Sequence, residues 1–499
     1  MGRWLLPTAQ QRWRFPPSEQ QRGIIAAELD GPQPSAVVVG IPMASSITTE
    51  DLKAFTTAWQ RAADDPVVRR AARLWQDRVA RLTPEAPLRV LMLLSQRPGQ
   101  TGSGVYLREV VGELQRAGHQ VTVLAGAYHP IRGDEVGGLP DDHVHTLLFS
   151  EDEANPQGDV PFPISGMSLQ MPYPSRPFRD LTEAQLNTYL RAFYGKIRRL
   201  ALDFRPDLIH VNHLWLLNPI ARLAAPWLPI VTTVHGTAYK LLLDAPRFGP
   251  LVRPGVQSVE RVMPISPRTG EQAVQAFGVE ASRVRVIGNG YNHRLFRLQS
   301  VDRAALFAHY RIRLPNPKAR IVLCVSKFAD YKGLPYLIRA AAHYHRAFPE
   351  PVATLIVGEG PPEARARLEA LVHRLGLEGE VLLPGKARYE DVSRLMNVAD
   401  LFVLPSVEEP FGLVLIEALA SGLRVIATDR GGPPTFVPAE LRAAGLAELV
   451  RPIAVDARGK PLPQDEEPFS RELAEAVLRM LHRPVTMAER RRIADAVAD

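Results

Sequence analysis

The sequence predicts an α/β protein with two Rossmann-like domains, and three features of the chain predict this class. Strand-sized apolar runs, which are typical of parallel strands buried on both faces, alternate with segments of helical spacing. The alternation occurs twice, once from Leu88 and again from Arg320. Glycine-rich or charged turns follow several of the runs, and this edge of an open parallel sheet is where ligands bind.

Composition narrows the class of protein further. The chain has 499 residues, of which 46% are apolar, so there is room for two or three domains with cores of their own. No apolar run approaches 18 residues and Met1–Trp13 does not have the pattern of a signal peptide, so we expect a soluble, cytoplasmic protein. The single cysteine, Cys324, excludes internal disulfides.

The net charge of +7 is unevenly distributed. Residues 251–350 hold 16 Lys and Arg against 6 Asp and Glu. This basic band suits an anionic partner, either nucleotide phosphates or, through peripheral contact at the inner membrane face, acidic lipid headgroups. The alternative is a solvated, Arg-rich surface. No nucleic-acid-binding motif is present, so we expect no nucleic-acid partner. Only 8 of the 60 cations are lysines, yet Lys327 and Lys332 fall within one short turn.

Residues 1–86 are expected to form an accessory segment. A strand is predicted at Ala36–Ile41 and a helix from Thr49 to Ala63. A second helix, Val67–Leu82, follows Pro66, which suits the first position of a helix. No chemistry is assigned to this segment, and we expect a packing or partner-binding role for it.

The first Rossmann-like domain is expected over residues 87–300. The run Arg89–Leu94 predicts a buried strand and Val105–Ala117 the helix after it. Between them, the loop Pro98–Gly104 carries glycines, including Gly102 and Gly104, that allow the backbone to approach a ligand, and a helix start favours an anion there. A second strand at Gly118–Leu124 makes the sheet parallel.

Periodicity fails from Tyr128 to Asp180. Six prolines between Asn155 and Pro177 exclude a regular helix or a central strand there. Aromatic and methionine side chains indicate that this Pro-rich loop, residues 155–178, is ordered, because disordered segments contain few of them. A loop of this length inside a compact domain is usually functional. Thr182 and Gln185 then form a capping box for a helix.

Strands at Asp207–Val211 and Pro229–Val234 continue the first domain. The second of them ends at His235, which places an imidazole at the carboxyl edge, either as a functional group or as a hydrogen-bonded structural residue. A zinc site of three histidines (His210, His213 and His235) is disfavoured, because their spacing matches no closed site and no cysteine supports it. Segments 262–266 and 284–290 are predicted to complete this half of the chain.

Residues 292–319 are polar and Arg-rich, as an interdomain connection would be, and the second domain is expected over residues 301–499. Its predicted strands are Arg320–Val325, Ala353–Val357, Val381–Gly385 and Ala399–Leu404, with helices from Leu334, at Glu363–Leu375 and at Tyr389–Asn397. Lys327 and Lys332 lie in the turn after the first strand, and Gly358 follows the second. Two such domains leave a cleft between facing carboxyl edges.

The most informative stretch is Pro405–Gly422. It passes from a strand through an acidic turn, which contains Glu409, into an apolar helix that carries Glu417. Backbone N–H groups at the start of that helix, together with Glu409, are thereby expected at the ligand-binding edge. Glu417 can face the same crevice.

From residue 325 to residue 434, the chain resembles the retaining family 4 glycosyltransferases of GT-B fold in every landmark and in their order. The matching motifs are Glu409 with Glu417, Lys332-Gly333, Gly358–Pro361 and Gly431-Gly432. The N-terminal half agrees more loosely, through Gly99–Gly104, Asp207–His213, Thr233–Gly236 and Asn289-Gly290. Together the resemblance covers about residues 88–495 and implies transfer of a hexosyl group from a nucleotide diphosphate sugar to a hydroxyl on a small-molecule, saccharide or lipid acceptor.

The resemblance also implies roles for individual residues. Lys332 matches the family lysine that stabilises the leaving diphosphate, and Lys327 stands where the family usually has arginine, which keeps the charge but loses the bidentate fork. Glu417 would bind the ribose hydroxyls. Glu409, with the backbone N–H groups of Phe411, Gly412 and Leu413, would hold the transferred sugar.

Further roles follow from the same resemblance. His235 would contact the sugar near the reaction centre, and Gly102 and Gly104 would approach the diphosphate or an acceptor anion. Gly385 and Lys386 follow the strand whose loop meets the nucleobase. We expect front-face transfer without a cofactor or a metal ion, because the lysines serve the diphosphate and no Asp-x-Asp motif stands at a strand end.

Other functions stay open at this point. A nucleotide-sugar epimerase, a sugar phosphorylase, or a non-catalytic module that binds polyanions or a membrane surface could use the same fold.

One departure from the family pattern concerns the end of the chain. Family members commonly continue past the helix at Glu489–Ala496 into a helix that crosses back onto the N-terminal domain, whereas this sequence stops at Asp499. We therefore expect that crossover to be missing, altered or removed.

Overall fold

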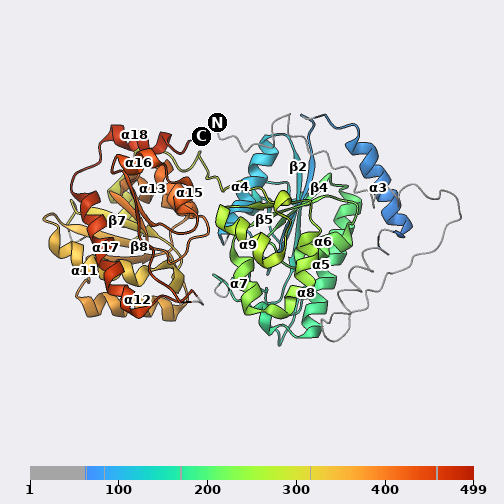
Figure 1. Ribbon diagram of the computed structural model, residues 1–499, viewed down its shortest axis with the longest axis horizontal. Helices are drawn as coiled ribbons and strands as arrows, with labels where there is room; N and C mark the ends of the chain where they lie inside the picture. The colour runs from blue at the N-terminus through green and yellow to red at the C-terminus, as the bar shows by residue number, and fades with distance from the viewer. Residues whose placement is uncertain are drawn as a thin grey trace.

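Two α/β domains lie side by side in the computed structural model (Figure 1). The structure describes residues 62, 64–83, 85–99, 101–168, 171–314, 316–456 and 459–498. The strand that the sequence predicts at Ala36–Ile41 lies outside the described residues. The helix predicted from Thr49 to Ala63 also lies outside them, except for residue 62. The helix predicted at Val67–Leu82 is present as α3 (Pro66–Val79), with Asp65 as its N-cap.

The first domain contains a six-stranded parallel sheet in the order β3-β2-β1-β4-β5-β6. Its strands are β1 (Arg89–Leu94), β2 (Gln120–Ala127), β3 (Val144–Leu148), β4 (Leu208–Asn212), β5 (Ile230–Val234) and β6 (Arg261–Pro264). Its α-helices are α4 (Gly102–Arg116), α5 (Glu183–Asp203), α6 (Leu217–Ala224), α7 (Thr237–Asp244), α8 (Gly249–Gln257) and α9 (Pro267–Phe277). Short 3-10 turns are η2 (Gly133–Val136), η3 (Asp141–His143), η4 (Phe178–Asp180), η5 (Pro246–Phe248) and η6 (Ala281–Arg283).

The second domain repeats this plan with the sheet order β12-β11-β10-β7-β8-β9. Its strands are β7 (Arg320–Val325), β8 (Val352–Val357), β9 (Val381–Gly385), β10 (Leu401–Leu404), β11 (Val425–Thr428) and β12 (Ala447–Val450). Its helices are α10 (Arg303–His309), η7 (Asp330–Lys332), α11 (Leu334–Ala347), α12 (Pro362–Leu375), α13 (Tyr389–Val398), α14 (Leu413–Ala420), α15 (Pro433–Phe436), α16 (Ala439–Ala443), α17 (Pro463–Leu481) and α18 (Met487–Asp495).

Apolar side chains alternate between the two faces of each sheet, because successive residues of a strand point in opposite directions. In β1, Leu91 and Leu93 pack into the layer that contains α5, α6 and α8, whereas Val90, Met92 and Leu94 pack against α4. The continuous apolar runs in the sequence reflect this burial on both faces. The fold class that the sequence predicts is therefore confirmed.

Both sheets have the strand order of a doubly wound Rossmann fold. Counted within each domain, the order is 3-2-1-4-5-6, which reverses direction between β1 and β4 in the first sheet and between β7 and β10 in the second. At such a switch point the loops that leave the two strands turn away from each other, and ligands bind between them. The topology therefore directs attention to the carboxyl ends of β1, β4, β7 and β10.

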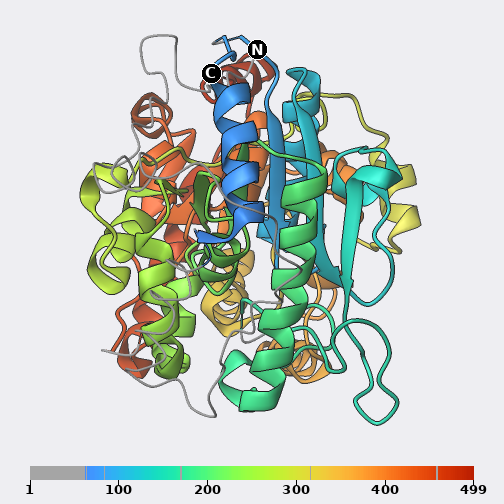
Figure 2. The same ribbon diagram turned by 90° about the vertical axis from the view of Figure 1, so that its right-hand side faces the viewer.

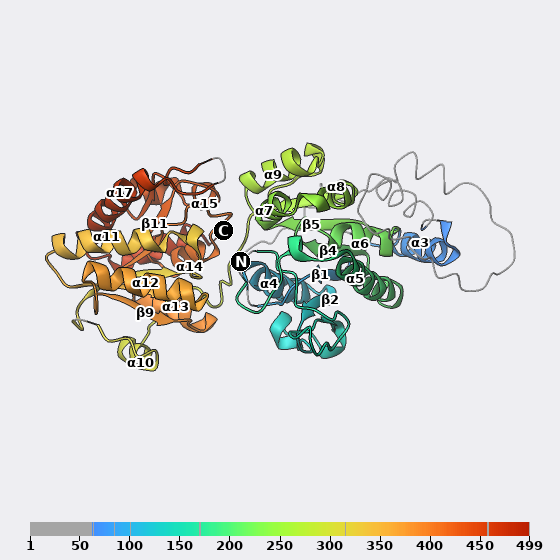
Figure 3. The same ribbon diagram turned by 90° about the horizontal axis from the view of Figure 1, so that it is seen from below.

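The opposite, amino-terminal edges of the sheets are held by two equivalent aspartates. Asp207 accepts a hydrogen bond from the backbone N–H of Arg89 at the start of β1, and Asp400 accepts one from Ile321 at the start of β7, both at 2.8 Å. Asp207 also pairs with Arg78 of α3 at 2.6 Å. Helix α3 is thereby attached to the end of the sheet that lies away from the switch point, on the outer side of the domain (Figures 2 and 3).

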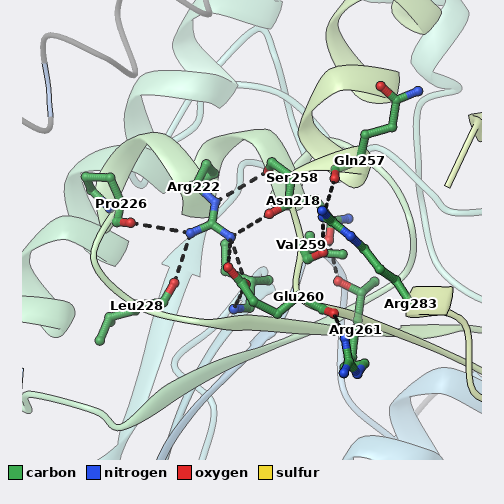
Figure 4. A network of polar contacts seen from close by, with 12 residues as sticks. Asn218, Arg222, Pro226, Leu228, Gln257, Ser258, Val259, Glu260, Arg261 and Arg283 are labelled. Atoms are coloured by element: carbon green, nitrogen blue, oxygen red, sulfur yellow. Dashed lines mark hydrogen bonds and ion pairs between the residues drawn. The ribbon is translucent and has the colours of Figure 1, made fainter. Parts of the chain in front are cut away.

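A buried arginine joins several elements of the first domain (Figure 4). Arg222 of α6 is 2% exposed and makes an ion pair with Glu260, in which its Nη2 atom lies 2.9 and 2.8 Å from the two carboxylate oxygens. Its guanidinium also donates to the carbonyl oxygens of Leu228 and Ser258. Glu260 in turn accepts from the backbone N–H of Ile230 at 2.6 Å, so the pair connects α6 to the starts of β5 and β6.

Some expectations from the sequence are wrong or incomplete. The stretch from Tyr128 to Asp180 contains β3, an edge strand whose residues are mostly half-buried and therefore lack a continuous apolar run. The segment from Val284 forms a single bridge to Val262 and continues without regular structure, since β6 already ends the sheet. Strand β12 and helix α17 were also not predicted from the sequence.

The Pro-rich loop is an ordered part of the core. Among its described residues, Phe162, Ile164, Met167 and Phe178 are at most 1% exposed and pack beneath α5 and α6. The loop also contacts the turn after β1, because the backbone N–H of Met167 donates to the side chain of Gln96 at 3.3 Å. This segment therefore combines a packing role with a position beside the switch point.

The basic band at residues 251–350 is divided between the domains. Its residues up to Arg285 lie in the first domain, whereas those from Arg303 onward belong to the second. Several of its arginines are bound within the protein, such as Arg320, which pairs with Glu350 and Asp400. In the part of the chain that the structure describes, no helix combines the length and apolarity needed to cross a membrane.

The Arg222–Glu260 pair yields a prediction about stability. Replacing Glu260 with Ala should lower the free energy of unfolding by about 3 kcal/mol, because it leaves the Arg222 guanidinium buried without its carboxylate. Urea denaturation followed by circular dichroism would measure this change. Glu369→Ala is the control, because its pair with Arg365 is exposed and should contribute only about 0.5 kcal/mol. Equal losses in the two variants would contradict the structural role of the buried pair.

Candidate functional site

Loops at the carboxyl ends of the switch-point strands carry most of the residues that the sequence singles out. Gly102 and Gly104 follow β1, and Lys327 and Lys332 follow β7. Glu409 and Gly412 follow β10, while His235 follows β5 in the neighbouring position of the first sheet. The two groups of loops face each other where the domains meet (Figure 3).

The centre of the second domain's group is a buried ion pair. The Nζ atom of Lys332 lies 2.6 Å from Oε2 of Glu409, and both side chains are largely buried. The hydroxyl of Ser406 donates to the same carboxylate oxygen at 3.0 Å. Burial acts to lower the pKa of Lys332, but the Glu409 carboxylate outweighs it and the pKa is raised. Lys332 therefore stays charged, and it links the turns after β7 and β10 across the switch point.

Three lysines surround one aromatic ring at this place. The Nζ atoms of Lys240, Lys327 and Lys332 lie 4.9, 5.1 and 5.4 Å from the ring centre of Tyr331. Lys240 belongs to α7 of the first domain and also approaches Glu408, at 3.9 Å. Cations within about 6 Å of an aromatic face are attracted to it. In a chain with only 8 lysines, this grouping concentrates positive charge where the domains meet.

The turn before α14 presents backbone donors to the same region. Gly412 is the N-cap of α14 and has a positive φ of 99°, which suits glycine. Within the described residues, no acceptor is found for the backbone N–H groups of Phe411, Gly412 and Leu413. The Phe411 side chain itself stacks on Phe436, with ring centres 4.6 Å apart, so it is a packing residue and only its backbone is available.

Glu417 lies on α14, where it is 3% exposed, and accepts a hydrogen bond from the hydroxyl of Tyr389 at 2.8 Å. Burial raises the pKa of its carboxyl to about 8, against the lowering effect of this hydrogen bond. The guanidinium of Arg108, from α4 of the first domain, lies 4.8 Å from the centre of the Tyr389 ring. Glu417 and Tyr389 thus form a second polar group at the domain interface.

His235 sits in a buried polar cluster at the end of β5. Its Nε2 atom lies 3.2 Å from Oδ1 of Asn212, the last residue of β4. Its ring packs against those of Tyr106 and His213, each with centres 4.9 Å apart. Burial and the two neighbouring histidines hold the pKa of His235 well below its usual range, so the imidazole is neutral.

Contacts between the domains bring the two groups of loops together. A Cβ on Gly236 would lie 3.0 Å from the Cβ of Pro410, which places the turn after His235 against the acidic turn. Ile265, after β6, packs with Phe411 and Ile416 in a small apolar cluster. His235 and Glu409 are therefore in neighbouring loops across the interface, although no hydrogen bond or ion pair joins them among the described residues.

Two of the predicted glycines are required by packing within their own loops. A Cβ at Gly104 would lie 2.6 Å from the backbone nitrogen of Gly99, and one at Gly358 would lie 1.9 Å from the carbonyl oxygen of Ser326. Either substitution would force backbone movement. Gly385 ends β9 with a φ of 93°, and the exposed Lys386 after it pairs with Glu359 at 2.7 Å.

Sequence reasoning missed four residues of this region: Tyr331, Lys240, Tyr389 and Asn212. The scarcity of lysine was a usable signal for Lys240, as it was for Lys327 and Lys332. Asn212 could have been noticed as a polar residue that ends an otherwise apolar strand. Tyr331 and Tyr389 carried no signal of their own, since their roles arise from residues far away in the chain.

A cavity of about 340 Å³ is lined by other residues than those of the predicted site. It is bounded by α11, α12 and the turn that contains Asp330, and none of the predicted site residues lines it. Within the described ranges, no group of three or more His, Cys, Asp or Glu side chains has an arrangement that could hold a metal ion. His210 and His213 instead meet Thr233 and Thr237, at 2.7 and 3.3 Å.

Two family models match the chain. Residues 309–444 match "Glycosyl transferases group 1", and residues 101–290 match "Glycosyl transferase 4-like domain". The two matches cover most of the second domain's sheet and of the first domain's sheet, respectively.

Individual relatives agree with the family models. The chain is 26% identical to D-inositol 3-phosphate glycosyltransferase of Corynebacterium efficiens over 362 residues, which are 68% of this chain and 78% of the relative. It is 33% identical to the enzyme of the same name from Rhodococcus jostii over 276 residues, 51% of this chain and 59% of that relative. Alignments with other such relatives also span only about 61% of their length.

Solved structures share the fold. HepE of Anabaena, in complex with UDP and glucose, superposes with a TM-score of 0.55 at 20% identity and covers 82% of this chain and 93% of its own. Sucrose-phosphate synthase from Thermosynechococcus elongatus gives a TM-score of 0.53 at 21% identity, over 82% of this chain and 98% of its own. At these identities the likeness concerns the fold alone.

The raised pKa of Glu417 predicts a pH-dependent stability. The folded protein holds this proton more tightly than the unfolded chain, so stability falls as the pH rises from the ordinary carboxyl value of 4.5 to about 8. Glu417→Gln stays neutral and should gain stability relative to the natural protein over that range, by at most about 1.4 kcal/mol per pH unit. Urea denaturation at pH 5, 6, 7 and 8 would measure the difference. Exposed Glu440→Gln is the control, and parallel pH curves for natural protein and Glu417→Gln would show that Glu417 ionises normally.

Proposed function

Because the chain belongs to the family 4 glycosyltransferases of GT-B fold, we propose that it transfers a hexosyl group from a nucleotide diphosphate sugar to a hydroxyl group of an acceptor, with retention of anomeric configuration. The second domain would hold the nucleotide sugar and the first domain the acceptor, with residues 87–300 and 301–499 as the two working units. Residues 1–86 would be an accessory segment.

The observation that carries this proposal is the lysine group around Tyr331, together with the N–H groups at the start of α14, for which no acceptor is found within the described residues. Cleavage of a sugar–phosphate bond develops negative charge on the departing diphosphate. Fixed cations and N–H donors at that position stabilise the transition state more than the ground state. One unit pair at 4 Å contributes about 4 kcal/mol at an effective dielectric constant of 20, so two lysines are sufficient for several powers of ten in rate.

Lys327 and Lys332 would bind the diphosphate, and Lys240 would add a third cation from the first domain. In this structure the charge of Lys332 is balanced by Glu409. A bound diphosphate would compete for this lysine and leave Glu409 free to accept hydrogen bonds from sugar hydroxyls. The lysines would in this way perform the neutralisation that divalent metals provide in many enzymes with phosphate leaving groups, without a cofactor.

Glu417 would bind the nucleotide ribose, since two carboxylate oxygens suit a diol. Tyr389, which now occupies one of these oxygens, would have to yield it. Gly385 and the backbone at Lys386 would meet the nucleobase, Gly358 would shape the floor of the donor site, and Gly102 and Gly104 would approach the diphosphate. His235 would contact the transferred sugar.

We propose front-face transfer, in which the departing phosphate helps to deprotonate the acceptor. The ion pair of Glu409 with Lys332 and its hydrogen bond from Ser406 support a positioning role for this carboxylate over that of a nucleophile. A nucleophile would need to stand beside the anomeric carbon on the face opposite the leaving group.

The acceptor is a small molecule, a saccharide or a lipid. The Pro-rich loop would shape its pocket, because Met167 contacts Gln96 and Gln96 in turn donates to Ser103 at 2.8 Å beside the glycine loop. D-inositol 3-phosphate, named for several relatives, is the first acceptor to test. UDP, which is bound in HepE, is the first nucleotide.

Product analysis separates the candidate activities. The protein would be incubated with labelled UDP-hexoses, or with the adenosine and guanosine counterparts, with and without acceptor. A labelled acceptor glycoside with the anomeric configuration of the donor supports the proposal. An epimerised nucleotide sugar indicates an epimerase, and sugar 1-phosphate formed from free phosphate indicates a phosphorylase. Salt-sensitive binding to anionic vesicles, without any thermal shift with nucleotides, would indicate a non-catalytic surface-binding module.

Substitutions in the donor site should separate binding from turnover. Lys332→Ala and Glu417→Ala should each weaken binding of the nucleoside diphosphate about 10- to 100-fold, because the first removes a charged hydrogen-bonding partner and the second removes the carboxyl group that binds the ribose. Glu409→Gln should mainly lower kcat. Calorimetric titration and initial rates would measure these effects.

Lys318→Ala is a suitable control, since Lys318 is exposed in the same basic band but lies outside the site. Its affinity for the nucleotide should be unchanged. Unchanged affinity in both Lys332→Ala and Glu417→Ala, with melting temperatures that show folded protein, would disprove the assignment of the donor site.

A further inference from the structure

The orientation of the Asn212 side chain is determined by a neighbouring main-chain group. Its Nδ2 atom lies 3.2 Å from the carbonyl oxygen of Leu93 in β1. A carbonyl oxygen can only accept a hydrogen bond, so the amide nitrogen of Asn212 has to face Leu93. The amide oxygen must then face His235, and Oδ1 is the atom found 3.2 Å from Nε2 of that ring.

This arrangement decides which nitrogen of His235 carries the proton. The Oδ1 atom of Asn212 can only accept, so Nε2 of His235 has to donate and must be protonated. A neutral imidazole has one N–H, which leaves Nδ1 as an acceptor. Asn212 is 1% exposed, so water cannot readily replace either of its partners.

The Nδ1 side of the ring remains available to a ligand. Within the described residues no hydrogen bond to Nδ1 of His235 is found, and the residue keeps 9% of its surface exposed. The next residue, Gly236, lies against Pro410 of the acidic turn. Tyr106 and His213 pack against the ring and restrict its rotation, with Tyr106 itself held by a 3.1 Å hydrogen bond to Thr233.

We propose that Asn212 is a positioning residue that holds His235 in the Nε2–H form, so that Nδ1 accepts a hydrogen bond from a hydroxyl of the transferred sugar. The contact to a sugar rests on the proposed function, whereas the tautomer does not. The carbonyl of Leu93, the amide of Asn212 and the imidazole of His235 form a directed chain that ends in an acceptor at the domain interface.

This polarity restricts what the site accepts. Glu409 is an acceptor when ionised, and Nδ1 of His235 is an acceptor as well, so the face of the ligand between them has to supply donors. A free hydroxyl meets this requirement. Fluorine in place of that hydroxyl does not, because it cannot donate, although its size and electronegativity are similar. The site would therefore select for unsubstituted hydroxyls on the transferred sugar.

Nitrogen-15 NMR of histidine-labelled protein tests the tautomer directly. The His235 signals would be assigned by their loss in His235→Gln. The natural protein should show a protonated Nε2 and an unprotonated Nδ1 between pH 6 and 8, with no titration. A proton on Nδ1, or rapid exchange between the two forms, would overturn the proposal.

Substitutions of Asn212 test its control over His235. In Asn212→Leu, a close match in size, the single tautomer should be lost, and kcat/KM should fall about 10- to 100-fold. Asn212→Asp keeps an acceptor and adds charge, so His235 should begin to titrate in the neutral range. Asn218→Leu is the matched control, because Asn218 is also a buried amide at this edge but bonds to the carbonyls of His213 and Trp215. It should lower the melting temperature without changing the His235 signals, and unchanged signals in Asn212→Leu would overturn the proposal.

The sugar contact has its own readout. Donor sugars with fluorine at one hydroxyl position at a time would be compared by kcat/KM. One position should show a penalty of about 10-fold or more in the natural protein and a much smaller one in Asn212→Leu. If no nucleotide sugar reacts at all, the proposed function fails while the NMR result still decides the tautomer. If transfer occurs but no fluorine penalty depends on Asn212, only the sugar contact is disproved.

Discussion

The buried ion pair between Lys332 and Glu409 is the interaction on which the second domain's site depends. It joins the turns after β7 and β10, the two strands between which the sheet order reverses. An unpaired charge that is buried this deeply has a large desolvation free energy. Each of the two side chains therefore stabilises the charge of the other when no ligand is bound. The pair therefore holds the two loops in fixed positions relative to each other before any ligand binds. It also keeps a lysine charged in a place where burial alone would favour its neutral form.

How far the sequence predicts this structure depends on the range of the interactions involved. Strands such as β1, β7 and β10 were predictable because burial on both faces leaves a continuous apolar run. The edge strand β3 was not, since its residues are mostly half-buried. In the site, residues with a charge at a strand end, such as Lys332 and Glu409, could be placed beforehand. Tyr331 and Tyr389 could not, because their roles depend on which distant residues they contact, and for Asn212 the sequence shows a polar strand end but not its partner His235.

The two halves of the interface differ in character, and this follows from their burial. The side that carries Lys332 contains a buried ion pair with Glu409, and its buried Glu417 carboxyl accepts a hydrogen bond from Tyr389. The histidine cluster on the side that carries His235 is neutral, because burial lowers the pKa of each of its three imidazoles and, for His235, the two neighbouring histidines lower it further. Two of the three lysines around Tyr331 belong to the second domain, so most of the positive charge of this group lies there. The separation of roles proposed for the domains has its physical origin in this difference.

The aspartates at the amino-terminal edges have a consequence for how the protein is made. Asp207 reaches the start of β1 across 118 residues of chain, whereas Asp400 reaches the start of β7 across only 79. At ribosomal speeds of about 5–20 residues per second, β1 waits roughly 6 to 24 seconds for its central partner. During that time one edge of the apolar strand β1 has no neighbouring strand. The first half of the nascent chain is thus the part with the greater need for chaperones, while the second domain can close soon after its last strands emerge.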